Sequence, residues 1–517
     1  MTDTEAASQE ETIAFLSRPA THGVARVEAI ETHTAIVFLA GERACKLKKA
    51  VHYTYLDYST PEARRRFCEA ELAVNRPLAP GLYLAVESVT RARDGGLRIG
   101  GEGEAVDWLV VMRRFDQADQ FDRMAERHAL PIELMRPLAD RIAAFHRRAA
   151  STPHYGGVEG MRKATGFTIE NLRLAVGHGL AREGVERWIG RAVAAIDRLA
   201  PLLERRREAG HVRACHGDLH LQNICLFEGQ PTLFDAIEFD PALSCTDVLY
   251  DLAFLLMDLR HRGLEAHGGT VFNRYLDRCD EADGLEALPL FMSARAGIRA
   301  QIAIANALHR HEAGDNAALE AQARGYLALA LELLEPSAPR LLAIGGVSGT
   351  GKSTLAYAMA PGLASAPGAR VVRSDILRKR AAGVSPESRL PESHYTVEAH
   401  AENHRRLLAE VRAVLAAGRA VIVDAVLALP SERGELEALA RQAGVPFQGL
   451  WLDAPVEMLE RRILQRRGDA SDAGIEVMRA QLQRGGIPAG WQIVDASGAP
   501  AAVAAAAVKL LRPANAT

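Results

Sequence analysis

The sequence LLAIGGVSGTGKST, residues 341–354, decides the fold of the C-terminal part of this 517-residue chain. A short apolar run, 341–344, leads into a glycine-rich turn that fits G-x-x-x-x-G-K-[ST], and an Ala- and Leu-bearing helical pattern follows. Strand, glycine-rich turn and helix in this order are the context in which the motif binds phosphate. Backbone N–H groups of the turn and the positive N-terminal end of the helix both attract phosphate oxygens. The stretch therefore predicts a nucleotide-binding loop.

The loop also supplies side chains for a nucleotide and its metal. Lys352 is expected to reach the β- and γ-phosphates, and Ser353 to hold Mg²⁺. A lysine here is informative, because only seven of the 62 basic residues of the chain are lysine. The residues expected around the nucleotide are Gly346, Val347, Ser348, Gly349, Thr350, Gly351, Lys352, Ser353 and Thr354.

Beyond residue 340, short apolar strands alternate with helical stretches. The strands are expected at 341–344, 370–373, 420–423, 449–452 and 492–494, and an alanine-rich closing helix at 499–511. Such alternation predicts a parallel sheet flanked by helices, the architecture of P-loop nucleotide-binding proteins. Asp424 directly follows the third strand, which makes it a candidate to act on Mg²⁺, directly or through water.

Several charged residues of this region fit phosphoryl transfer. Asp375 and Arg378 are three residues apart at the start of a predicted helix, so they share one face and suit a base and an anion-binding group. This D-x-x-R resembles the substrate element of P-loop kinases of the gluconate-kinase and polynucleotide-kinase type. Arg462 and Arg466 follow the fourth strand one helical turn apart, where related kinases carry lid arginines. Arg433 is a weaker candidate.

A second constellation for phosphoryl transfer lies upstream. Residues 216–224 read HGDLHLQNI, and the sequence LFD follows at 233–235. Asp218 can orient or deprotonate an attacking hydroxyl, while Asn223 and Asp235 can hold Mg²⁺ against a triphosphate.

This segment resembles the catalytic and metal loops of aminoglycoside phosphotransferases, which have a bilobal protein-kinase-like fold. Their loop usually reads H-G-D-[LI]-H-x-x-N, and every fixed position is present. The resemblance implies a strand lysine on the α/β-phosphates of ATP and a helix glutamate that orients it. Lys46 is the first choice for the lysine and Lys48 the alternative, because both face the same side of a predicted strand. Glu71 is the best partner, with Glu69 as the alternative.

The organisation of the chain follows from these two regions. A proline-containing stretch, PSAP at 336–339, separates a helical run from the phosphate-loop strand. We therefore predict a kinase-like domain at 1–335, with an N-lobe at about 20–115 and a C-lobe at about 116–335, and a P-loop kinase-like domain at 336–517. Strands at 35–39, 44–47, 83–89 and 108–113 and a helix at 61–78 are expected in the N-lobe.

The composition of the chain limits the partners and the cellular compartment that we expect. A formal net charge of −3 gives no electrostatic basis for binding nucleic acid. Six cysteines without paired spacing, and an acidic N-terminus unlike a signal peptide, fit a reducing, cytoplasmic setting. No apolar stretch reaches the length of a membrane span, so no membrane partner is expected.

Over nearly its full length the chain resembles bacterial bifunctional proteins that fuse an aminoglycoside phosphotransferase-like domain to a P-loop kinase domain. The resemblance implies two ATP- and Mg²⁺-dependent sites that phosphorylate hydroxyl groups of small molecules. Two alternatives stay open: a nucleotide-sensing regulator in which one domain binds ATP without catalysis, and a nucleic-acid end kinase. The acceptors and the oligomeric state do not follow from the sequence.

Overall fold

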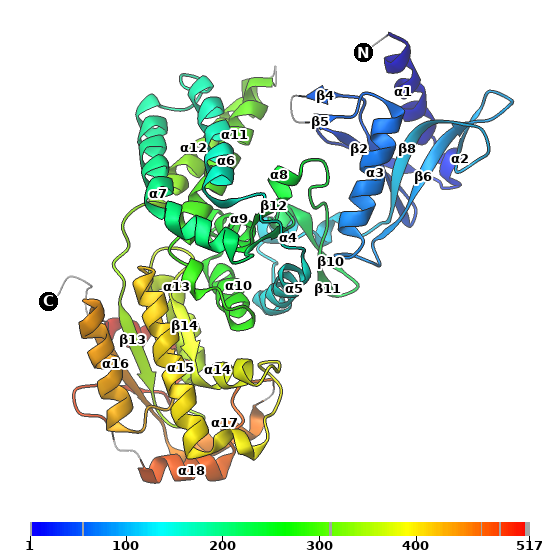
Figure 1. The fold of residues 1–517 in the computed structure, drawn as a ribbon. Coiled ribbons are helices and arrows are strands. Elements are labelled where there is room, and N and C mark those ends of the chain that lie inside the picture. Colours follow the sequence, from blue (N-terminus) through cyan, green and yellow to red (C-terminus); the bar gives the residue numbers. More distant parts are fainter. Residues whose placement is uncertain (1–2, 54–55, 310–312, 467, 485–486, 512–517) are drawn as a thin grey trace. The chain divides into compact units, whose positions relative to one another are not determined.

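The computed structural model describes residues 3–53, 56–309, 313–466, 468–484 and 487–511. They form two compact units, drawn with their elements in Figure 1. The first comprises Met1–Met161 and Glu204–Leu255, and the second Arg162–Leu203 and Leu256–Thr517. The two units are described separately below.

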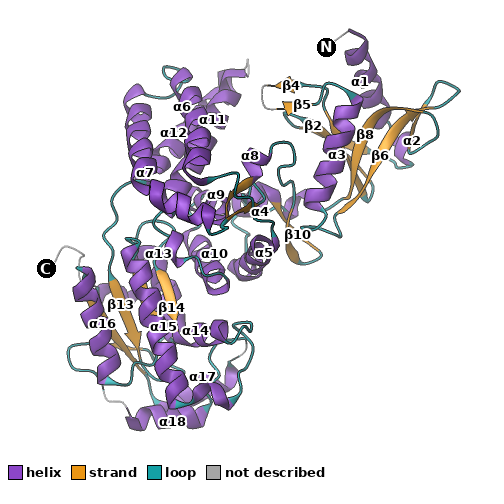
Figure 2. Ribbon diagram, in the orientation of Figure 1, coloured by secondary structure: helices purple, strands orange, loops and turns teal. Residues whose placement is uncertain are grey.

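The first unit is built on an antiparallel sheet, which lies in the part of the chain where the sequence predicts the strands of the N-lobe (Figure 2). Its strands, in spatial order, are β1 (Val27–Glu31), β2 (Ala35–Ala40), β3 (Arg43–Lys48), β8 (Glu104–Arg113), β6 (Tyr83–Arg91) and β7 (Leu97–Ile99). All four strands expected there are confirmed, with small differences at their ends. In the turn between β6 and β7, Asp94 Oδ1 accepts a hydrogen bond from Gly96 N at 3.0 Å.

Two helices cover this sheet. Helix α3 (Pro61–Asn75) begins at Thr60, whose hydroxyl accepts a hydrogen bond from Ala63 N, and it packs against β8 and β6. It confirms the predicted helix, which ends three residues earlier than expected. Helix α1 (Asp3–Leu16) was not expected from the sequence, and it closes the opposite hydrophobic cluster with Leu16 among strand residues of β2, β3 and β8.

The rest of the first unit is mainly helical and carries the second constellation on short strands. Its further elements are α4 (Phe121–Glu126), α5 (Met135–Arg148), β9 (Val212–Ala214), β10 (Ile224–Phe227), β11 (Gln230–Leu233), α8 (Pro241–Ser244) and β12 (Cys245–Asp247). The hairpin of β10 and β11 separates the HGD loop from Asp235. Helix α9 (Val248–His261) follows β12 and runs into the second unit.

The second unit contains the predicted parallel sheet (Figure 2). Its strands, in spatial order, are β14 (Arg370–Arg373), β15 (Val421–Asp424), β13 (Leu341–Gly345), β16 (Phe447–Asp453) and β17 (Gln492–Asp495). All neighbouring strands pair in parallel. The predicted fold class is therefore confirmed for both parts of the chain.

Helices cover both faces of this sheet, as the pattern of buried positions requires. Leu342 and Ile344 of β13 point to the face packed by α13 (Lys352–Leu363) and α19 (Pro500–Leu510). Helix α15 (Val397–Ala416) packs against β14 and β15, and helix α16 (Pro430–Ala443) packs against β16. The remaining helices of this region are α14 (Ser374–Ala381), α17 (Val456–Gln465) and α18 (Ile475–Arg484).

The second unit also holds helices that precede the predicted boundary at 335/336. They are α6 (Gly157–Leu174) from Arg162 onward, most of α7 (Arg182–Glu208), α10 (Glu265–Arg278), α11 (Leu288–His309) and α12 (Ala313–Leu333). The boundary itself stays a prediction.

Helix α10 covers the edge strand β14 of the parallel sheet. The Asn273 side chain donates to Ala369 O at 3.2 Å and accepts from Val371 N at 2.7 Å, which imitates a neighbouring strand. Arg370, buried beside it, lies 2.7 Å from Asp277. An exposed strand edge is a template for unwanted pairing, and α10 removes that edge.

Two further features of the structure concern its cysteines and the length of its apolar helices. All six cysteines are free and buried. Among the described residues, no helix combines the length and the apolar character that a bilayer crossing requires.

Candidate functional sites

The first site begins on β3, where the predicted lysine lies. Lys46 pairs in register with Val37 of β2 and Val110 of β8. Its Nζ lies 2.9 Å from Glu71 Oε1 on α3. The alternative partner, Glu69, is exposed and pairs with Arg65 of the same helix. Of the two glutamates, the structure therefore brings Glu71 to the lysine.

The predicted metal residue Asp235 joins the same lysine. Its Oδ1 lies 2.6 Å from Lys46 Nζ, although 189 residues separate the two in sequence. Asp235 has a φ of +60°, an unusual left-handed backbone for a non-glycine residue. Hydrogen bonds on both sides hold this turn: Asp235 N donates to the Tyr83 hydroxyl at 3.1 Å, and Ala236 N donates to Asn75 Oδ1 at 2.7 Å. Strained backbone of this kind is frequent at functional sites.

Burial and charge act against each other in this cluster. Burial alone would lower the pKa of Lys46, but the carboxylates of Asp235 and Glu71 raise it well above its usual value. Burial would likewise raise the pKa of Glu71, yet Lys46 and Lys48 lower it to about 2. The lysines and the glutamate are therefore charged at neutral pH.

The HGD loop places the other predicted residues of this site together. The Asn223 amide donates to the Asp218 carboxylate at 2.8 Å and to its main-chain oxygen at 2.9 Å. His220 Nε2 lies 3.3 Å from the same carboxylate. Asp218 is partly exposed, so an acceptor hydroxyl could approach it from solvent.

Asp251 of α9 fixes the start of this loop. Its carboxylate accepts hydrogen bonds from Gly217 N at 2.8 Å and His216 N at 3.2 Å, and it lies 3.0 Å from His146 Nε2. Gly217 has a φ of +82°, and a Cβ there would lie 3.1 Å from Leu243 O. The loop thus needs glycine at this position to present Asp218.

The donor set of the first site fits Mg²⁺. Asn223 uses its NH₂ group on Asp218, which leaves its Oδ1 as an acceptor. The side chain of Asp235 is 45% exposed, and among the described residues its carboxylate forms an ion pair only with Lys46. Hard oxygen ligands of this kind suit Mg²⁺. When bound, the metal would neutralise charge on the phosphates.

The second site is the phosphate loop between β13 and α13. Gly346, Gly349 and Gly351 all have positive φ. At Gly346 a Cβ would lie 2.6 Å from Leu452 O, so only glycine fits the close approach to β16. Strand pairing sets Asp424 beside Ile344. As a result, the hydroxyl of Ser353 donates to Asp424 Oδ2 at 2.5 Å, an oxygen pair that fits Mg²⁺.

The loop is held closed by its own side chains and by α18. Lys352 Nζ donates to Val347 O at 3.0 Å, and the Thr350 hydroxyl donates to the same oxygen at 2.9 Å. Ser348 N donates to Gln481 Oε1 of α18 at 2.8 Å. Burial lowers the pKa of Lys352, although Asp424 and other acidic groups act in the opposite direction. A bound phosphate would stabilise the charge of this lysine.

Asp375 and Arg378 lie next to each other on α14, as their spacing predicts. Their side chains are 3.6 Å apart. Burial raises the pKa of Asp375, with Asp424 adding to the effect and Arg373 opposing it. The Arg378 guanidinium lies 4.7 Å from the centre of the Tyr395 ring. A carboxyl with a raised pKa beside an arginine suits acid–base work on an anionic substrate.

The three other candidate arginines have different hydrogen-bond partners in the structure. Arg466 donates to the Ser348 hydroxyl of the phosphate loop at 3.0 Å. Arg462 donates to Ala496 O at 2.9 Å, and Arg433 to Leu427 O at 2.7 Å. Of these three arginines, Arg466 is the one that bonds to the loop within the described part of the chain, so its position fits a lid arginine best.

Two residues beside the loop were missed from the sequence. Arg373 ends β14 and lies 3.1 Å from Asp424 and 2.9 Å from Asp469. Its place at a strand end, next to Asp375, was a usable signal. Gln481 binds Ser348 N, but nothing in its helix distinguished it from a surface glutamine.

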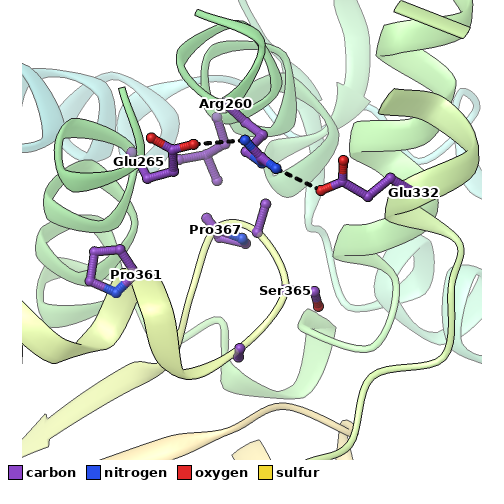
Figure 3. Close-up of a pocket in the computed structure, with 10 residues that line it drawn as sticks. Arg260, Glu265, Glu332, Pro361, Ser365 and Pro367 are labelled. Carbon is purple, nitrogen blue, oxygen red and sulfur yellow. Dashed lines mark hydrogen bonds and ion pairs between the residues drawn. The ribbon is translucent and has the colours of Figure 1, made fainter. Parts of the chain in front are cut away.

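A separate pocket of about 290 Å³ lies in the second unit (Figure 3). Arg260 crosses it and pairs with Glu265 at 2.7 Å and with Glu332 at 2.8 Å. The loop that follows α13 and contains Ser365 and Pro367 forms another wall. None of the predicted site residues lines this pocket.

Comparison with known proteins defines the class of the molecule. The phosphotransferase enzyme family matches residues 60–291, and an AAA domain matches residues 341–486. The chain therefore carries a phosphotransferase-family domain fused to a P-loop kinase-like domain, as the sequence resemblance predicted.

Mycobacterial relatives cover almost the whole chain. Among them, the uncharacterized protein Rv2004c of Mycobacterium tuberculosis is 29% identical over 466 residues, which are 89% of this chain and 90% of the relative. The chain is homologous to this mycobacterial protein.

Two kinases match shorter parts. The adenylyl-sulfate kinase of Myxococcus xanthus is 34% identical over 129 residues, which are 24% of this chain and 64% of that enzyme. A solved structure, the APS kinase CysC of Mycobacterium tuberculosis in complex with AMPPNP and APS, is 22% identical with a TM-score of 0.26 and covers 34% of this chain and 97% of its own.

Proposed function

We propose that the chain is a bifunctional ATP-dependent phosphotransferase, in which each site transfers the γ-phosphoryl group of ATP to a hydroxyl of a small molecule. One observation supports this most strongly. Glu71 and Asp235, from distant parts of the sequence, both contact Lys46: their carboxylate oxygens lie 2.9 Å and 2.6 Å from Lys46 Nζ. Kinase-like phosphoryl transfer needs such a lysine, held by a helix glutamate next to a metal-binding aspartate.

In the first site, Lys46 would bind the α/β-phosphates while Glu71 orients it. Asn223 and Asp235 would hold Mg²⁺. Asp218, which the Asn223 amide and His220 orient, would accept the proton of the acceptor hydroxyl. A general base in this position contributes roughly 10²- to 10⁴-fold in rate.

In the second site, the loop from Gly346 to Thr354 would surround the phosphates. Ser353 and Asp424 would hold Mg²⁺, since their oxygens already share a hydrogen bond. Asp375 would take the acceptor proton, with Arg378 binding the acceptor. Arg466 would neutralise charge in the transition state. Arg462 is the less favoured candidate for that role, because it bonds to Ala496 O and not to the loop.

The six free, buried cysteines support a reducing compartment, so we place both reactions in the cytoplasm. The match to an adenylyl-sulfate kinase supports a small-molecule acceptor at the second site over a nucleic-acid end.

The test is a transfer screen. Full-length protein, Asp218→Ala and Lys352→Ala are each incubated with a metabolite extract and γ-labelled ATP, and labelled products are separated. We expect one set of products to vanish with Asp218→Ala and a different set with Lys352→Ala. Absence of any labelled product from the parent protein would contradict the proposal.

A further inference from the structure

A buried row of ion pairs runs past the first site and beyond the residues that the kinase mechanism requires. Lys46 Nζ contacts Asp235 and Glu71, and the second lysine of the strand, Lys48, continues the row. Lys48 Nζ lies 2.6 Å from Glu71 Oε2 and 2.6 Å from Glu238 Oε1. The row therefore reads Asp235, Lys46, Glu71, Lys48, Glu238 in space.

The two lysines share one glutamate without competing for it. Glu71 Oε1 binds Lys46 and Oε2 binds Lys48. In the kinase mechanism a single lysine pairs with the helix glutamate. Because Glu71 has both oxygens occupied, its carboxylate cannot rotate about its axis without breaking a buried ion pair.

Exposure differs along the row. The side chain of Lys48 is 2% exposed and that of Glu71 is fully buried, whereas the side chain of Asp235 is 45% exposed. The Tyr58 hydroxyl donates to Glu238 at 2.9 Å, and Lys48 Nζ lies 3.3 Å from the same hydroxyl. The Lys48 end is therefore closed off by protein, and the Asp235 end is open to ligands.

The charges of the row do not balance. Two lysines face three carboxylates, so one carboxylate charge is left over. The only partly exposed carboxylate is Asp235, which makes it the group that can leave Lys46 and turn to a cation. The four remaining charges, those of Lys46, Glu71, Lys48 and Glu238, then balance among themselves.

From this geometry we infer that Lys48 is a positioning residue. Its bridge between Glu71 and Glu238 fixes Glu71 and the metal-binding turn. Lys46 is then the lysine that releases Asp235 and binds the nucleotide. Glu238 is three residues beyond Asp235, and the bridge thus ties the turn to α3 and β3. The inference rests on the proposed function of the first site.

The test measures binding of a non-hydrolysable ATP analogue by calorimetry, with Mg²⁺ and with EDTA. The parent is the full-length Lys352→Ala protein, in which the first site is the remaining nucleotide site. Lys46→Met, Lys48→Met, Lys48→Arg and Glu238→Gln are added singly, and each is measured well below its unfolding transition. Lys49→Met is the matched control, because Lys49 follows directly in sequence and pairs only at the surface, with Glu31 at 2.7 Å.

A positioning role predicts a loss that depends on the metal. Lys48→Met and Glu238→Gln should weaken binding with Mg²⁺ by about 10- to 100-fold, the range found for groups that orient metal ligands, and change it little in EDTA. Lys46→Met should weaken binding in both conditions. Lys48→Arg should recover most of the affinity, and Lys49→Met should bind like the parent. Glu238→Gln keeps the test valid if Lys48→Met does not fold.

Other results overturn the inference in distinct ways. If Lys48→Met loses as much affinity in EDTA as Lys46→Met does, Lys48 itself binds phosphate. If folded Lys48→Met and Glu238→Gln bind like the parent in both conditions, the bridge only stabilises the fold. If the Lys352→Ala parent is folded but binds no nucleotide, the proposed function of the first site fails. The inference then fails with it.

Discussion

The two candidate sites hold phosphate-binding groups in opposite ways. In the first, side chains from distant segments balance one another: Lys46 contacts Glu71, 25 residues away, and Asp235, 189 residues away. In the second, one continuous loop provides the backbone and Lys352, and Asp424, 71 residues away, accepts a hydrogen bond from Ser353. The first site is an assembly of buried charges, and the second is a shaped backbone.

This difference has consequences for stability. Breaking a buried ion pair leaves an uncompensated charge, which costs several kcal/mol. Lys352, in contrast, does not stabilise the fold through its charge, because burial lowers its pKa. We expect its role to be the binding of a ligand. Substitutions in the first site should therefore damage fold and function together, and those in the second mainly function.

The largest effect is expected for Asp218→Ala. Loss of the proposed base should lower transfer at the first site by about 10²- to 10⁴-fold and leave transfer at the second unchanged. Labelled-phosphate transfer to the acceptors found in the screen measures both. Simultaneous loss of both activities in a folded protein would show that the sites are not independent.

Glu71→Gln should follow in size. The Glu71 carboxylate has a pKa of about 2 against an ordinary value of 4.5, so its ion pairs contribute about 3 kcal/mol to the free energy of unfolding. Because the folded pKa is the lower one, this contribution is complete above about pH 4.5 and is lost as the pH falls towards 2.

Denaturant unfolding of the parent and Glu71→Gln at neutral and acidic pH measures this contribution. The difference between the two proteins should shrink as the pH falls through that window. A difference that is small at pH 7, or constant with pH, would show that the row of ion pairs is not an important source of stability.

Lys352→Ala should affect ligand binding and leave the fold intact. With nucleotide at about 100 times its dissociation constant, the second site should gain about 2.7 kcal/mol of stability in the parent protein and almost none in the variant. Thermal unfolding of the C-terminal region with and without Mg²⁺ and nucleotide measures the gain. An unchanged nucleotide-dependent shift would contradict the assignment of the loop.

The smallest effect on stability is expected for Asp375→Asn. Burial raises the pKa of Asp375, so the folded protein holds its charge at a cost, and this cost grows as the pH rises through the folded pKa. The variant should lose transfer at the second site but unfold at the same temperature as the parent or slightly above it at neutral pH. A clear drop in Tm would mean that the carboxylate stabilises α14.

The sequence allowed much of this to be predicted, because local patterns carry it. The five strands of the parallel sheet and the phosphate loop follow from apolar runs and a contiguous motif. The choice between Lys46 and Lys48 could not be made, since alternate residues of a strand share a face and both lysines reach Glu71. Gln481 depends on tertiary packing that no spacing in the sequence reveals, whereas Arg373 could have been identified from its place at a strand end.

The account depends on two nucleotide sites in one chain, and binding stoichiometry tests this most directly. Calorimetric titration of the full-length protein with Mg²⁺ and a non-hydrolysable ATP analogue should give two equivalents. Lys352→Ala and Lys46→Met should each give one, and the double variant none. A folded parent protein that saturates at a single equivalent would contradict the account.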